Sequence, residues 1–170
     1  AGEVDQESLY LKPRSVNENA GHQLRLGVRA EQIDRDNKTI SLSDQSTLKY
    51  DRLVLATGSH VRRLKAPGSD LKGIHYLHDI ADTDALRNQL VPGKRLVIVG
   101  GGYIAVELAG VLNGLGSQVM QLYRGPHFLR GFDDDVRHFL AEEIRKKGID
   151  LQFNANIAKV DKRDNGTLVA

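Results

Sequence analysis

A glycine-rich run, Gly100-Gly101-Gly102-Tyr103-Ile104-Ala105, has the residue types and spacing that a phosphate-binding turn requires. It follows an apolar run at 96–99 and opens a segment with helical spacing. In such a turn Gly100 permits the tight bend, Gly102 lets the backbone approach a pyrophosphate, and the small Ala105 lets helix and strand pack closely. The N–H groups at the helix N-terminus then attract the anion. The context predicts a dinucleotide site, and a glycine-rich turn without a ligand is the alternative.

The end of the next predicted strand indicates which nucleotide this turn would hold. An NAD site usually places Asp or Glu about 20 residues on, to bond the ribose 2′-hydroxyl. Here the strand ends in Tyr123-Arg124 without a carboxylate, and Arg130 follows six residues after Arg124. Two guanidiniums can clamp a 2′-phosphate through charge-assisted hydrogen bonds of about 1.5–3 kcal/mol each. The pair predicts NADPH, and His127 between them can assist.

Other interpretations of these residues stay open. Arg124 and Arg130 can be an ordinary solvated pair, and Asp133–Asp135 can bond the ribose of NADH, although they lie well past the strand end. Tyr103 and Glu107 stand one helical turn apart and suit a surface aromatic and a solubilising carboxylate as well as a functional pair. His75 and His78 can share one helical face, but no carboxylate or thiol partner stands at ligand spacing from them, so no metal site is expected.

The composition excludes several classes of function. The 24 basic and 22 acidic residues are well mixed and give a net charge of only +2, which predicts neither a nucleic-acid nor an anionic membrane surface. The absence of cysteine excludes disulfides, thiolate metal sites and a thiol relay within this chain. The longest uncharged run, 96–106, is far shorter than the about 20 residues of a membrane span. A soluble, cytoplasmic location is expected.

The elements that must position these residues follow an α/β pattern. The first 23 residues suit a loop with one short helix, and 52–58 suits a strand buried on both faces of a parallel sheet. Further strands are expected at 24–33, 39–42 and 47–50, as an antiparallel meander, and at 96–99, 118–123, 150–153 and 157–160. Helices are expected after Asp79, after the glycines and at Asp133. The apolar faces of the last two are Ile104, Leu108, Val111, Leu112 and Leu115, and Val136, Phe139, Leu140 and Ile144.

These motifs resemble the two-dinucleotide-binding flavoproteins, the pyridine nucleotide-disulfide oxidoreductase family, over nearly the whole chain. Residues 1–100 resemble ferredoxin and rubredoxin reductases in the runs 2–4, 9–11, 33–35, 50–59, 67–71 and 75–77. Residues 101–170 resemble bacterial glutathione reductases in the runs 102–110, 113–116, 122–126 and 128–133. The change of branch near the glycines leads to the hypothesis of a chimera, with an NADPH segment placed in a ferredoxin-reductase frame.

The resemblance implies a fold and two domains. The fold is a Rossmann-like parallel sheet with flanking helices, plus an antiparallel meander that belongs to an incomplete FAD domain. Residues 1–70 are expected to be part of the FAD-binding domain, and 71–170 an NAD(P)-binding Rossmann domain that is truncated at its C-terminus. The FAD pyrophosphate turn, the cysteine pair of glutathione reductases and the C-terminal dimerisation region are not found, so the chain is expected to hold NADPH without retaining FAD firmly.

The resemblance also implies roles for individual residues. Tyr103 and Glu107 match residues beside the nicotinamide, where the tyrosine acts as a lid over the flavin, so these two are the expected catalytic residues. Arg124 and Arg130 match residues that hold the 2′-phosphate of NADPH. The full set expected to bind cofactor is Gly100, Gly101, Gly102, Tyr103, Ile104, Ala105, Glu107, Tyr123, Arg124 and Arg130, with Ala56, Thr57 and Gly58 adjoining FAD.

The implied reaction passes hydride from NADPH to flavin and electrons onward to a ferredoxin-like protein. One alternative acceptor is glutathione disulfide. Another alternative is an isolated nucleotide-binding module without turnover. The family is compatible with a homodimer.

Overall fold

The computed structural model describes residues 4–170 and divides the chain into two units, Ala1–Ser59 and His60–Ala170. Gly2 and Glu3, which open the first run of the family resemblance, lie outside the described residues. Within residues 4–170, no helix is long and apolar enough to cross a lipid bilayer.

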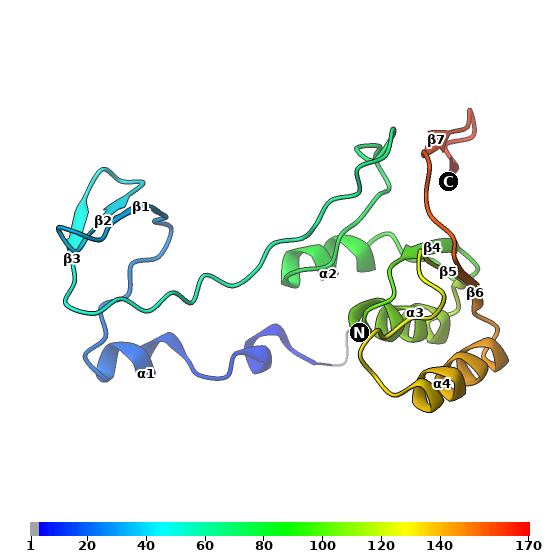
Figure 1. Ribbon diagram of the computed structural model, residues 1–170, viewed down its shortest axis with the longest axis horizontal. Coiled ribbons are helices and arrows are strands. Elements are labelled where there is room, and N and C mark those ends of the chain that lie inside the picture. The colour runs from blue at the N-terminus through cyan, green and yellow to red at the C-terminus, as the bar shows by residue number, and fades with distance from the viewer. Residues whose placement is uncertain (1–3) are drawn as a thin grey trace. The chain divides into compact units, whose positions relative to one another are not determined.

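The first unit contains the antiparallel meander that the sequence predicts. A 3-10 helix, η1 (Gln6–Leu9), and a short helix, α1 (Arg14–Asn19), precede the strands β1 (Ala30–Asp34), β2 (Thr39–Leu42) and β3 (Thr47–Lys49) (Figure 1). The strands pair in the order β1-β2-β3. At the first turn the Asp34 carboxylate accepts hydrogen bonds from the backbone N–H groups of Asp36 and Asn37, which fixes the reversal of the chain.

The prediction of a buried parallel strand at residues 52–58 is wrong for this structure. The segment has no regular secondary structure, and Val54 and Leu55 are 86% and 67% exposed. A parallel strand requires a neighbour for its backbone hydrogen bonds. Among residues 4–170, no strand pairs with this segment.

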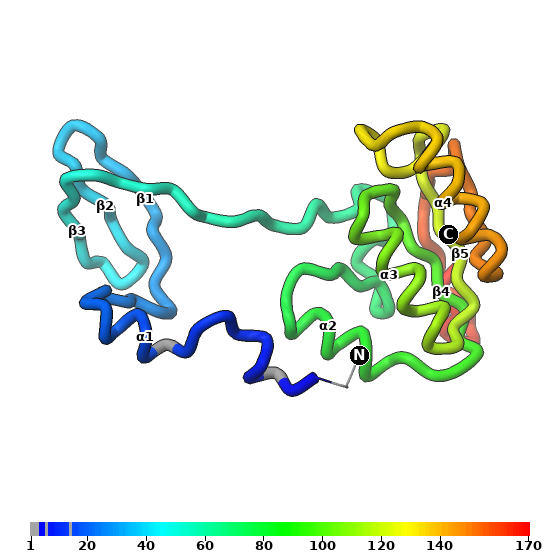
Figure 2. The backbone as a smooth tube through the Cα atoms, turned by 90° about the horizontal axis from the view of Figure 1, so that it is seen from below, coloured from blue at the N-terminus to red at the C-terminus, as the bar shows by residue number. Residues whose placement is uncertain are grey.

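The second unit contains a parallel sheet that confirms the predicted Rossmann-like architecture. Strands β4 (Arg95–Val99), β5 (Gln118–Tyr123) and β6 (Asp150–Phe153) lie side by side in that order. Helix α3 (Tyr103–Gly114) connects the first two strands and α4 (Asp134–Lys146) the next two. Both crossovers advance in the same direction, and Figures 1 and 2 show both helices on one side of the sheet.

The helix boundaries follow capping side chains that were visible in the sequence. The Asp79 carboxylate accepts from the Asp82 N–H at the start of α2 (Ile80–Arg87). The Asp133 carboxylate accepts from the Asp135 N–H at the start of α4. These caps satisfy N–H groups that have no partner within their helices.

The main core lies between the sheet and the two helices that cover it. Its buried members are Ile98, Ala109, Leu112, Val119, Phe128, Leu129, Ala141, Ile144, Ile149 and Leu151. The predicted helix faces are only partly correct, because several of their members are exposed: Ile104 and Val111 on α3, Leu115 at its C-cap, and Val136 and Phe139 on α4. The small Ala109 and Ala141 face the sheet instead, which lets both helices approach it closely.

The predicted strand at residues 157–160 does not form. Ile157 and Val160 are buried, but the short strands that follow are β7 (Asp161–Lys162) and β8 (Leu168–Val169). The Val160 N–H donates to the Pro67 carbonyl at 2.8 Å instead of joining a sheet. The segment therefore buries two apolar side chains without forming the predicted strand.

Candidate dinucleotide-binding site

The turn between β4 and α3 has the geometry that its glycines predict. Gly100 has a φ of +155°, and a Cβ built on it would lie 3.1 Å from the Cβ of Ala105, so strand and helix meet closely here. Gly102 is the N-cap of α3, and no side chain caps this helix. A Cβ on Gly102 would meet nothing within 4 Å. The turn therefore presents N–H groups of the first helical turn next to open space, an arrangement that fits a pyrophosphate.

The ring of Tyr123, at the end of β5, lies between two glycines. A Cβ on Gly101 would stand 2.4 Å from the ring, and a Cβ on Gly125 would stand 2.7 Å from it. No other residue type fits at either position without displacing the ring. Gly101 is thus required by packing, whereas Gly102 faces open space.

Gln121 supports the turn from the sheet, a role that the sequence pattern did not predict. Its side chain is 1% exposed, and its amide donates to the Gly100 carbonyl at 3.0 Å. The available signal was a polar residue in the same strand phase as the buried Val119. A polar side chain at such a position requires a buried hydrogen-bond partner, which Gly100 supplies.

The segment after β5, residues 124–132, runs back to the phosphate-binding turn. Phe128 and Leu129 are buried within it. The Leu129 N–H donates to the Gly101 carbonyl at 2.6 Å, and Leu129 has a φ of +54°, which is unusual for a residue with a side chain. This segment, called the specificity loop below, therefore contacts the turn directly.

The specificity loop carries both predicted phosphate-binding arginines. Arg124 and Arg130 are exposed. Among the residues that the structure describes, none forms a side-chain hydrogen bond or an ion pair with either guanidinium. Their donors are therefore available to an anionic ligand.

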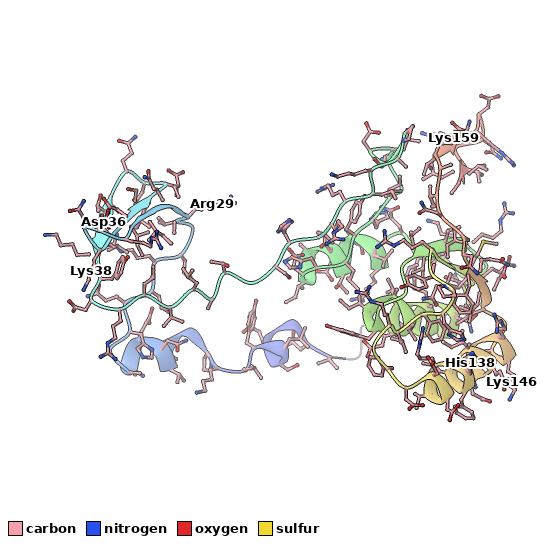
Figure 3. All side chains as sticks on the ribbon, in the orientation of Figure 1. Arg29, Asp36, Lys38, His138, Lys146 and Lys159 are labelled. Carbon is pink, nitrogen blue, oxygen red and sulfur yellow. The ribbon has the colours of Figure 1, made fainter. Side chains whose placement is uncertain are left out.

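His127 lies on the same loop, but its ring packs against protein. It contacts the rings of Phe128, Phe153 and His138, the last with centroids 4.3 Å apart; Figure 3 shows His138 on α4. Burial lowers the pKa of His127 below its usual range, and the charges of His138 and Arg137 lower it further. Because burial among these rings disfavours the charged form of His127, the aromatic cluster weakens its case as a phosphate ligand beside the arginines.

Two of the three carboxylates of the alternative NADH site, those of Asp133 and Asp134, have other partners. Asp133 caps α4, and the Asp134 carboxylate pairs with the Arg137 guanidinium. Both side chains are committed to the start of the helix, which weakens their case as ribose ligands.

The remaining predicted site residues are exposed. Tyr103, with 62% of its side chain exposed, and Glu107 lie on the first turns of α3, and Ile104 is exposed between them. Ala56, Thr57 and Gly58 belong to the first unit, in the segment without regular structure. Within residues 4–170, no group of three or more acidic or histidine side chains is arranged to hold a metal ion.

Comparison with known proteins agrees with this architecture. The Probable ferredoxin reductase CtmF of Castellaniella defragrans is 35% identical over 162 residues, 95% of this chain and 40% of that protein. The glutathione reductase of Burkholderia cepacia is 51% identical over 111 residues, 65% of this chain and 23% of that protein. A match of 111 residues is too long to lie within 1–100 or within 101–170, so both matches extend across the predicted change of branch near residue 100. The chain spans about two fifths of the length of several such relatives.

A solved structure shares the fold. An engineered water-forming NADPH oxidase, a variant of LbNOX from Lactobacillus brevis, was solved with NADPH bound. Its TM-score to this chain is 0.88 with 26% identity, over 97% of this chain and 38% of that one. Residues 2–170 match the family described as Pyridine nucleotide-disulphide oxidoreductase. With that match over nearly its whole length, the chain belongs to the pyridine nucleotide-disulphide oxidoreductase family.

Proposed function

We propose that this chain is the NADPH-binding portion of an FAD-dependent oxidoreductase that passes hydride from NADPH to flavin and electrons to a ferredoxin-like acceptor. The observation that carries the choice of NADPH is the pair Arg124 and Arg130, which have no side-chain partner among the described residues and lie on a loop that contacts the phosphate-binding turn. A 2′-phosphate distinguishes NADPH from NADH, and guanidinium is the side-chain group best suited to it.

The engineered NADPH oxidase supports this choice through the spacing of its substitutions. They introduce an alanine, then an arginine 19 positions later, then a second arginine six positions after the first, and they remove an aspartate just before the first arginine. In this chain Ala105, Arg124 and Arg130 have the same offsets, and Tyr123 stands where the aspartate was removed. Removal of a carboxylate and addition of two guanidiniums is the change that a 2′-phosphate requires.

The chemistry of hydride transfer belongs to the nicotinamide and the flavin when they are bound. The protein would hold the nucleotide and align it for that transfer. The first N–H groups of α3 would hold the pyrophosphate and the arginines the adenosine end, and the family resemblance assigns Tyr103 and Glu107 to the nicotinamide end. Tyr103 is exposed at the start of α3, so its ring would be free to contact a bound cofactor.

Calorimetric titration with NADPH and with NADH tests this proposal. The wild-type chain is expected to bind NADPH more tightly, and Arg124→Gln and Arg130→Gln are each expected to lose at least about tenfold in NADPH affinity with little change for NADH. Equal affinities in the wild type, or equal losses for both nucleotides, would reject the NADPH assignment. Glu143→Gln, at a partly buried position on α4 whose carboxylate pairs with Lys146, serves as a control for charge changes away from the loop.

The identity of the acceptor requires a separate test. The 95% coverage by a ferredoxin reductase favours a ferredoxin-like protein, and the 51% identity to a glutathione reductase keeps glutathione disulfide as the second candidate. NADPH-dependent reduction of a ferredoxin and of glutathione disulfide should be compared after added FAD. A flavin absorption band in the purified chain would favour turnover over a bare binding module.

A further inference from the structure

Arg137 is a largely buried arginine on α4 that faces the specificity loop. Its side chain is 16% exposed. Its Nε donates to the Phe128 carbonyl at 2.8 Å, one Nη donates to the His127 carbonyl at 3.0 Å, and the other pairs with the Asp134 carboxylate. A buried guanidinium must have such partners, and these three fix both its place and that of the loop carbonyls.

The part of the loop held by Arg137 leads directly to Arg130. The carbonyls of His127 and Phe128 accept hydrogen bonds from Arg137. The N–H of Leu129, the residue after Phe128, donates to the Gly101 carbonyl, and Arg130 comes next in the chain. The Leu129 carbonyl accepts a hydrogen bond from the Phe132 N–H at 3.0 Å, and this bond closes a tight turn that contains Arg130. The backbone of Arg130 is thus fixed between α4 and the phosphate-binding turn.

Arg124 is held by a different element. The Tyr123 carbonyl accepts from the Ala155 N–H at 3.1 Å, and the Gly125 carbonyl accepts from the Asn154 N–H at 3.0 Å. Both donors follow the end of β6, so the backbone on each side of Arg124 is fixed by the sheet. The two arginines therefore depend on separate supports.

We propose that Arg137 is a positioning residue for nucleotide specificity: it orients Arg130 toward the 2′-phosphate through the His127 and Phe128 carbonyls and leaves Arg124 unaffected. This inference rests on the proposed NADPH site. Arg137 touches no nucleotide in this scheme and acts only through the loop backbone. A merely structural role would weaken NADPH and NADH binding alike, whereas loop positioning changes their ratio.

A double-mutant cycle on the 170-residue chain tests the pairing, with NADPH and NADH affinities measured by calorimetry. Arg137→Gln is expected to weaken NADPH binding about tenfold and to leave NADH binding within about twofold. The tenfold effect should vanish in an Arg130→Gln background and persist in an Arg124→Gln background. An equal effect in both backgrounds, or equal losses for both nucleotides, overturns the proposal. Glu143→Gln, which removes a surface ion pair on the same helix, is expected to behave as wild type.

Amide hydrogen exchange tests the role of Arg137 independently of the proposed function. Without nucleotide, Arg137→Gln should speed exchange of the Leu129 amide at least about tenfold relative to wild type, while the Asn154 amide stays protected. Unchanged Leu129 protection overturns the positioning role, whatever the nucleotide preference is. If Arg124→Gln and Arg130→Gln do not alter the preference, the NADPH assignment fails and the exchange result still decides whether Arg137 fixes the loop. Should Arg137→Gln fail to fold, Arg137→Lys replaces it, because an ammonium lacks the fork that joins both carbonyls.

Discussion

The side-chain amide of Gln121 donates to the Gly100 carbonyl at 3.0 Å, from a side chain that is 1% exposed. This hydrogen bond joins the second strand of the parallel sheet to the first glycine of the phosphate-binding turn. The Gly100 N–H in turn donates to the Leu122 carbonyl at 2.9 Å, so β5 holds both polar groups of that glycine. The shape of the turn is therefore set by the sheet as well as by its own glycines.

Replacement of Gln121 by leucine should loosen the turn without unfolding the chain. A buried hydrogen bond contributes about 1 kcal/mol, but the Gln121 Oε1 has no partner among the described residues, and its removal offsets part of that loss. The free energy of unfolding should change by less than about 1 kcal/mol in urea melts. Calorimetry should show NADPH and NADH affinities falling by the same factor, and a changed ratio would contradict this role.

Gly102→Ala and Gly101→Ala should separate ligand binding from stability. A methyl group on Gly102 meets open space, so the unfolding free energy should fall by less than about 1 kcal/mol while both nucleotides bind at least about tenfold more weakly. A methyl group on Gly101 would lie 2.4 Å from the Tyr123 ring and should cost about 2 kcal/mol or more in stability. Denaturant melts and calorimetry on both variants check this. If Gly102→Ala keeps full nucleotide affinity, the proposal that this turn binds the pyrophosphate is wrong.

Gly68→Ala should destabilise the second unit far more than Gly93→Ala. The two glycines have nearly equal φ values, +80° and +78°. A side chain at either position therefore has the same backbone cost, about 1–2 kcal/mol. Only at Gly68 would the Cβ approach backbone, 1.9 Å from the Val160 carbonyl oxygen, whereas Gly93 faces open space. Urea unfolding should show a further loss of at least about 1 kcal/mol for Gly68→Ala. Equal losses would mean that the contact of Pro67-Gly68 with Val160 does not form.

The titration of His127 should make stability fall in mild acid. An unfolded histidine takes up a proton near pH 6.5, whereas the folded His127 stays neutral to lower pH because burial lowers its pKa. The unfolded state then binds more protons as the pH falls below about 6.5, so the free energy of unfolding decreases there and is fully retained above that pH. His127→Phe, which keeps a ring in the cluster, should flatten the profile between pH 5 and pH 7. Parallel profiles in urea melts would show that another group causes the loss.

Local sequence signals predicted the parallel sheet and its helix starts because each signal acts within a few residues. Asp79 and Asp133 cap their helices by bonds to N–H groups two or three residues away. The glycine-rich turn is equally local, since Gly100 and Ala105 meet across one strand-to-helix junction. Such contacts leave a clear trace in residue order.

The predictions that were wrong concern contacts between residues that are far apart in the sequence. Helical spacing grouped Ile104 with Leu112, but spacing alone does not decide which of two apolar stripes faces the sheet. In the structure Ala109 and Leu112 are buried, whereas Ile104 is exposed. The apolar run at 52–58 has the composition of a buried strand, yet pairing requires a partner strand that no local pattern specifies.

Two supporting residues of the candidate site were missed although a signal was present. Gln121 has the strand phase of the buried Val119, and Arg137 has the helical phase of Ala141 and Ile144. A polar residue in a buried phase indicates a partner but not its identity. The partners, the carbonyls of Gly100, His127 and Phe128, became known only from the fold.

The confinement of the Tyr123 ring makes it a natural spectroscopic reporter. A Cβ on Gly101 would lie nearest the Cδ2 atom of the ring and a Cβ on Gly125 nearest its Cε1 atom, so we expect a half-turn of the ring to require movement of both backbone segments. Slow rotation would give four resolved ring-proton resonances in place of the averaged two, without any introduced label. Their coalescence on warming would report how readily the phosphate-binding turn separates from the loop that carries the arginines.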